Sequence, residues 1–257
     1  MPALIAERVG AVMRLELNEP DTLNALSSQL TKELSRAVAA AVEDAAVRCI
    51  LLTGTGRAFC AGGDVRAMDD RRPGAVRALV ETHHGWMRQL LNGGKPVVTA
   101  VNGLAVGAGL AIALLGDIVI ASDAAVFRSA FLGLGAVPDL GLAFTLPRAV
   151  GFQRASDIIL TNRVVKAEEA ERIGLVARIV PADELQPEAM RAAEALASGP
   201  TAAMGLAREL LRRAHDTPLE QFLQTEALAQ AAAFGTDDFA EGVAALREKR
   251  PARFSGR

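Results

Sequence analysis

The uncharged stretch of residues 96–116 restricts the fold of this sequence more than any other feature. It is long enough to raise the idea of a membrane-spanning helix. However, Asn102-Gly103 is a turn signal, and Gly107 and Gly109 interrupt the run. Asp117 follows and leads directly into a further apolar segment. We therefore expect a buried strand, a turn and a helix in this stretch, and no membrane contact.

Short β-rich runs alternate with amphipathic runs through the first half of the chain. Their spacing predicts strands at 12–17, 47–53, 96–101 and 118–121, a glycine-rich loop at 54–63, and helices at 27–43, 77–91 and 108–115. Ser27 or Ser28 is a suitable N-cap for the first helix. This succession predicts a layered α/β core.

The second half has helical spacing almost throughout. The predicted helices are 152–160, 166–173, 187–198, 202–214, 219–234 and 237–249, with Gly174 ending the second and a short extended piece at 179–181. At 257 residues we expect one main domain, residues 1–195, followed by a helical region, residues 196–257. Long alanine-rich amphipathic helices usually pack against another surface.

Composition excludes several classes of protein. Charged residues make up 23% and the net charge is −2, so no basic surface favours nucleic acid. Neither Cys49 nor Cys60 lies in a metal-ligand spacing, and with three histidines we expect no metal site. No secretory signal is visible at the N-terminus, so we expect a cytoplasmic, reduced protein.

Two glycine-rich loops have a local sequence that suits the binding of an anionic oxygen. The loop at 54–63 and the loop around Gly107-Ala108-Gly109 each follow a strand, but neither completes a nucleotide-binding motif. Where such a loop runs from a strand into a helix, backbone N–H groups are left unpaired. Two such groups can form an oxyanion hole, which stabilises charge on a carbonyl oxygen. An ordinary tight turn that needs glycine is the alternative for each loop.

Three segments carry a family resemblance: Leu23-Asn24-Ala25-Leu26, the run TGTGRAFCAGGD at 53–64, and the run EGVAALREKRPARF at 241–254. In order and spacing the chain resembles the enoyl-CoA hydratase/isomerase (crotonase) family over nearly its whole length. The resemblance implies a ClpP/crotonase-like spiral of ββα units with a C-terminal helical trimerisation region. It also implies an acyl-CoA substrate, a homotrimer or a dimer of trimers, and no cofactor other than the coenzyme A that the substrate carries.

The resemblance assigns the oxyanion donors to the N–H groups of Gly63 and Ala108. It also aligns Ala111 and Phe131 with the two glutamates that carry out hydration in the hydratases of the family. Neither residue has an acid, so hydration by that route should be absent or very slow.

Asp139, in the run LGAVPDLG at 134–141, is the carboxylate that remains. This run is most similar to the ring-epoxide isomerases and other enoyl-CoA isomerases that use one acidic residue. One carboxylate suffices for a 1,3-proton shift, because the same group can take the proton and return it. Leu142 departs from the glycine that is frequent in the family and alters the expected acyl pocket. From the residues alone, a turn-forming or helix-capping aspartate is the alternative.

Further site residues are implied less directly. Arg57 and Arg66 could meet the phosphates or adenine of coenzyme A, and Lys249 or Arg250 resembles a basic residue that contacts it across a subunit boundary; as alternatives, each is an ordinary surface charge. The remaining substrate-binding residues expected from the resemblance are Ala61, Asp64, Val65, Gly109 and Phe131. We interpret Trp86 and Met68 as packing residues.

Two other functions stay open. The 4-halobenzoyl-CoA dehalogenases of the superfamily use an aspartate in the register of Asp139 as a nucleophile, with a histidine at the position of His84 as base. They differ in having tryptophans where His83 and Phe131 stand and a bulkier residue in place of Gly63, and His83-His84 could equally be a solvated or packing pair. The third hypothesis is a CoA-ester-binding protein with little activity.

Overall fold

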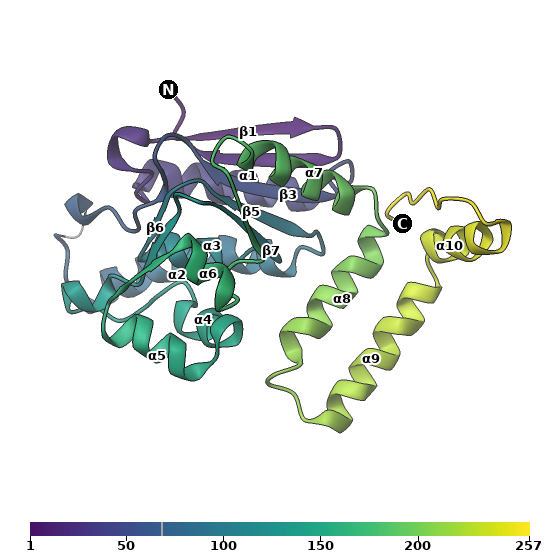
Figure 1. Ribbon diagram of the computed structural model, residues 1–257. Coiled ribbons are helices and arrows are strands. Elements are labelled where there is room, and N and C mark those ends of the chain that lie inside the picture. Colours follow the sequence, from purple (N-terminus) through teal and green to yellow (C-terminus); the bar gives the residue numbers. More distant parts are fainter. Residues whose placement is uncertain (68) are drawn as a thin grey trace.

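The fold is built on a central sheet of mostly parallel strands (Figure 1). The computed structural model describes residues 1–67 and 69–257, so the packing role expected for Met68 lies outside the described residues. Among the described residues the central sheet has the order β1-β2-β3-β5-β7-β10. β1 and β2 form an antiparallel hairpin and the other neighbours run parallel. Its strands are β1 (Leu4–Val9), β2 (Val12–Leu17), β3 (Cys49–Gly54), β5 (Val97–Val101), β7 (Ile118–Ser122) and β10 (Arg178–Val180).

Alternate residues of this sheet enter two separate cores. Leu51 and Val98 face one side, where they pack with Ala189 and Ala193 of α7 (Leu185–Ala197). The neighbouring residues, such as Leu52, face the larger core beneath the other side. All of β3 is buried, which explains its uncharged sequence.

A second, smaller sheet lies beside the central one and carries the glycine-rich loops. Its strands are β4 (Ala58–Cys60), β6 (Leu104–Val106), β8 (Val126–Arg128) and β9 (Val164–Lys166), in that order. The loop predicted at 54–63 is therefore wrong in part, because β4 lies within it. The uncharged stretch of residues 96–116 forms β5, β6 and α3 (Ala108–Ala113). Within the described residues no helix is both long and apolar enough to cross a membrane.

Several helices enclose the larger core. Ser27 caps α1 (Ser28–Glu43) by accepting a hydrogen bond from Leu30 N, as the sequence predicts. α2 (Pro73–Asn92) begins four residues before its predicted start, because proline suits the first turn of a helix. The other helices here are α4 (Leu142–Val150), α5 (Phe152–Leu160) and α6 (Ala167–Arg172), with short 3₁₀ helices η1 (Pro20–Thr22), η2 (Val65–Ala67) and η3 (Phe131–Leu134).

The last three helices form an arm that extends from the core in Figure 1. It consists of α8 (Thr201–Arg213), α9 (Leu219–Phe234) and α10 (Asp237–Glu248). Arg208 and Arg212 of α8 both form ion pairs with Asp117 at the start of β7 and join the arm to the central sheet. The predicted boundary between 195 and 196 falls in the last turn of α7, and the division into two regions stays a prediction.

Candidate active site

The two glycine-rich loops lie against each other. Gly62, which follows β4, has φ +100°, and Gly107, which follows β6, has φ +57°. A methyl group on Gly62 would lie 2.8 Å from Val106 O and 3.4 Å from Ala108 N. Only glycine provides both this backbone conformation and this close approach.

The contact leaves two backbone donors without an acceptor. Leu26 N–H donates to Gly62 O at 2.8 Å, and Gly107 N–H donates to Arg128 O at 2.9 Å. Across residues 1–67 and 69–257, the N–H groups of Gly63 and Ala108 have no hydrogen-bond acceptor in the protein. Ala108 is the first residue of α3, where the N–H groups of a helix are unused within it. The structure thus brings the two predicted donor segments together, in an arrangement that can bind an anionic oxygen.

Asp139 lies in the loop between η3 and α4. Leu140 and Gly141 follow it with φ +44° and +73°, and Gly141 is the N-cap of α4, with no side-chain capping bond. The backbone carbonyl of Asp139, and not its side chain, accepts the N–H of Leu142 at 2.9 Å. The structure therefore contradicts a helix-capping role for this carboxylate. Within the described residues its Oδ1 atom is buried and has no hydrogen-bond partner.

The environment of Asp139 favours the protonated form. Burial raises the pKa of the Asp139 carboxyl above its usual range, while the charge of His84 opposes this shift. His84 lies on α2, whose Met87 side chain would be 3.8 Å from a methyl group on Gly141. Residues three apart share a helix face, so His84 and Met87 both lie on the side of α2 that meets the Asp139 loop. Met87 was not predicted to lie near the site, although its spacing of three residues from His84 on one helix was a usable signal.

His83 points elsewhere and is a packing residue. It is buried, and the indole Nε1–H of Trp86 donates to its Nδ1 at 3.3 Å. Burial lowers the pKa of His83, and the neighbouring charge of His84 adds to this effect. Trp86 itself lies in the larger core, as predicted.

No carboxylate stands at either position that the hydratase pattern would require. Ala111 lies in α3 with 0% of its surface exposed, within the larger core. Phe131 opens η3, is half-buried and packs against the same core.

The remaining predicted residues of the first loop surround Gly63. Ala61 N–H donates to Leu23 O at 2.9 Å, which fixes the loop against η1. Asp64 pairs with Arg66 through both carboxylate oxygens, and the hydrogen bonds from Arg66 lower the pKa of Asp64. Val65 and Arg57 are exposed, so Arg57 is open to a ligand whereas Arg66 is already paired.

Gly109 and Lys249 differ in their relation to these loops. Gly109 packs so closely against β4 that a methyl group on it would lie 2.0 Å from Cys60 O. Lys249 is exposed and is the C-cap of α10, with φ +54°. In Figure 1 α10 lies on the arm, away from β6 and α3 of its own chain.

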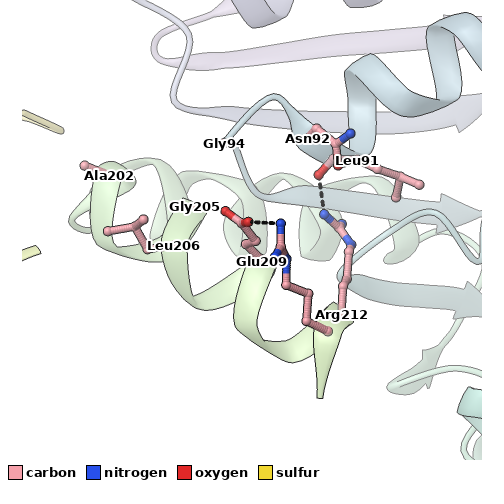
Figure 2. Close-up of a pocket in the computed structure, with 9 residues that line it drawn as sticks. Leu91, Asn92, Gly94, Ala202, Gly205, Leu206, Glu209 and Arg212 are labelled. Carbon is pink, nitrogen blue, oxygen red and sulfur yellow. Dashed lines mark hydrogen bonds and ion pairs between the residues drawn. The ribbon is translucent and has the colours of Figure 1, made fainter. Parts of the chain in front are cut away.

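A cavity of about 440 Å³ lies at a different place, between the end of α2 and α8 (Figure 2). In Figure 2 the Arg212 side chain donates to the carbonyl of Leu91. Arg213, which also lines the cavity, pairs with Glu209. Its lining does not include Gly63, Ala108 or Asp139. The cavity is therefore separate from the candidate active site.

Comparison with known proteins places this chain in a family. The family described as Enoyl-CoA hydratase/isomerase matches residues 7–257. The chain belongs to the enoyl-CoA hydratase/isomerase family. A probable enoyl-CoA hydratase of Rhizobium meliloti is 40% identical over 99% of this chain and 98% of the relative. A 1,2-epoxyphenylacetyl-CoA isomerase of Escherichia coli is 38% identical over 96% of this chain and 95% of its own.

Solved structures confirm the predicted crotonase fold. An enoyl-CoA hydratase from Bacillus anthracis has a TM-score of 0.94 at 32% identity, covering 99% of this chain and 100% of its own. A Geobacillus kaustophilus protein titled as an enoyl-CoA hydratase subunit has a TM-score of 0.93 at 38% identity, with 99% and 98% covered. This protein is thus an acyl-CoA enzyme of the enoyl-CoA hydratase/isomerase family. The names of its relatives include both hydratases and an isomerase.

Proposed function

We propose that this enzyme moves the double bond of an unsaturated acyl-CoA. In this reaction the Asp139 carboxylate takes a proton from one carbon of the acyl chain and returns it to another. The electrons of the broken C–H bond pass into the thioester, whose oxygen becomes an enolate. The N–H groups of Gly63 and Ala108 hold that oxygen, and the double bond forms again when the proton is returned.

The observation that carries the proposal is the buried Oδ1 of Asp139, which has no partner in the part of the chain that the structure describes, together with the absence of acids at Ala111 and Phe131. A carboxylate that is taken out of water without a partner is a stronger base than a solvated one. Its raised pKa suits proton abstraction from carbon. With one acid, a proton shift is the reaction of this family that the residues support best.

The proposed reaction is redox-neutral, so we propose that no cofactor is needed beyond the coenzyme A of the substrate. Arg57 is exposed near the first loop and suits an anionic part of coenzyme A. The charge of Arg66 is offset by its ion pair with Asp64, so we assign Arg66 a secondary role in binding coenzyme A.

The test is the substitution Asp139→Asn, assayed with enoyl-CoA and dienoyl-CoA substrates. Removing the base should lower turnover by at least about 100-fold and leave the binding of an acyl-CoA almost unchanged. Asp123→Asn is the matched control, because Asp123 is an exposed aspartate on β7's C-terminal side. Full activity of Asp139→Asn would exclude the proposed role. Binding without turnover in the wild type would instead support a CoA-ester-binding protein.

His84 supports a second candidate, in which Asp139 attacks the ring of a halogenated benzoyl-CoA. Nucleophilic catalysis needs a base that activates water for the second step, and the charge of His84 acts on Asp139. Single turnover in ¹⁸O-labelled water distinguishes the reactions. A nucleophilic Asp139 would release halide and incorporate the label into its own carboxylate, whereas a proton shift does neither.

We also propose a homotrimer or a dimer of trimers, acting in the cytoplasm without nucleic acid or membrane partners. In the single chain α9 has no buried residue, and Leu219, Leu228 and Phe234 are 67%, 74% and 53% exposed. Such an apolar helix needs a partner surface. Cys49 and Cys60 are free thiols whose pKa burial raises to about 12, which is consistent with a reducing compartment.

A further inference from the structure

Asn162, in the loop between α5 and β9, is hydrogen-bonded to the segment that leads into η3. Its side-chain Oδ1 accepts the N–H of Ala130 at 2.8 Å and the Nε–H of Arg128 at 3.2 Å. The backbone carbonyl of Asn162 accepts the same Arg128 Nε–H at 3.0 Å. Asn162 has φ +54°, in the left-handed region that asparagine tolerates better than most residues.

The bond to Ala130 holds an unfavourable conformation in place. Ala130 has φ +62°, which costs a residue with a Cβ about 1 kcal/mol or more. The chain enters η3 at this point, and Ala136 N–H closes the following loop on Phe131 O at 3.0 Å. Asp139 lies three residues beyond Ala136. Asn162 therefore fixes the start of the segment that ends at the proposed base.

Asn162 is also linked to the second oxyanion loop, through Arg128. Arg128 O accepts the N–H of Gly107 at 2.9 Å, and Gly107 immediately precedes the donor Ala108. Val106 also pairs with Arg128 in the register of β6 and β8. Arg128 is thus held by Asn162 through its side chain and by Gly107 through its carbonyl.

We propose that Asn162 is a positioning residue that keeps the oxyanion donor Ala108 and the base Asp139 in a fixed mutual arrangement; this inference rests on the proposed function. It touches neither the substrate nor the reacting atoms. Its effect is geometric, since a proton shift needs the thioester oxygen and the acidic carbon to be held at once. Misplacement by about 1 Å is enough to lower a rate about 100-fold.

Kinetics of three variants test this role. Asn162→Ala removes the acceptor and should lower kcat by about 10- to 100-fold, with KM within about twofold of the wild type. Asn162→Gly accepts the left-handed backbone but also lacks the acceptor, so it should be equally slow. Asn162→Asp keeps both properties and should restore kcat to within about threefold of the wild type. Wild-type kcat in the alanine and glycine variants would overturn the proposal.

Amide hydrogen exchange gives a readout that does not depend on activity. In Asn162→Ala, exchange should become faster in two segments distant in sequence, residues 104–112 and 128–140, and stay unchanged in β2. Faster exchange in residues 128–140 alone, or in neither segment, would refute the coupling. If the wild type converts no unsaturated acyl-CoA, the proposed function fails, while the exchange result still decides whether Asn162 joins the two loops.

Discussion

Substituting alanine for Gly62 should separate the binding of an acyl-CoA from its turnover. Gly62 has φ +100°, and a methyl group there would lie 2.8 Å from Val106 O and 3.4 Å from Ala108 N. The added group therefore meets the end of β6, where the chain turns into the second oxyanion donor.

The size of the effect follows from this geometry. The Val106 carbonyl must retreat by about 0.6 Å to reach an ordinary contact distance, and Ala108 must move with it because the interior is closely packed. One oxyanion donor contributes about 3 kcal/mol to the transition state, so kcat should fall about 100-fold while KM changes less than about threefold. The backbone strain should lower the free energy of unfolding by roughly 1–2 kcal/mol, or about 2–8 °C in Tm.

Steady-state kinetics with an unsaturated acyl-CoA, paired with thermal denaturation, provides the assay. Gly10→Ala is the control, since Gly10 has φ +58° in the β1–β2 turn and a methyl group there would contact nothing within 4 Å. Both variants should lose stability, and only Gly62→Ala should lose kcat. An unchanged kcat in Gly62→Ala, or an equal loss in Gly10→Ala, would refute the reasoning.

Three further outcomes are expected. His84→Gln should move the acid limb of kcat/KM to higher pH, because the charge of His84 lowers the pKa of Asp139 and its loss leaves burial unopposed; an unmoved limb would contradict this. Asp139→Asn should raise Tm at pH 7 by about 2–4 °C, equal to about 1 kcal/mol. Because the pKa of Asp139 is raised in the folded state, its protonation stabilises the fold. This contribution is fully present below the unfolded-state pKa and is lost as pH rises through the folded-state pKa. The gain in Tm of Asp139→Asn over the wild type should therefore shrink on acidification. Leu228→Glu, on the exposed face of α9, should reduce the mass seen by light scattering after gel filtration, and an unchanged mass would argue against an α9 interface.

Regular spacing made the longer elements predictable. The structure confirms helices at 152–160 and 219–234 and the strand at 12–17 with the predicted bounds. β6, β8 and β9 were missed, because three residues are too few to show an alternation. α4 was missed because Pro147 stands within it and glycines flank it at both ends.

The sequence was a better guide to the loops of the site than to their supports. Short continuous motifs contain Gly63, Ala108 and Asp139, so these residues can be picked out from the sequence alone. The contact of Met87 with the Asp139 loop and the bonds of Asn162 depend on how distant helices and loops pack. Asn162 carried one weak signal, since asparagine is favoured where the backbone is left-handed.

The complete burial of Ala111 restricts which side chains this position can accept. A glutamate introduced there would bring a longer, charged side chain into a closely packed core whose described neighbours are apolar, and the loss of its hydration would be costly. Placing an acid there would require compensating changes in neighbouring core residues. The oxyanion donor Ala108 begins the same helix, α3, and is 4% exposed, so a shift of this helix would also move the donor. The packing around α3 therefore limits which acids a single substitution can add beside the oxyanion loops.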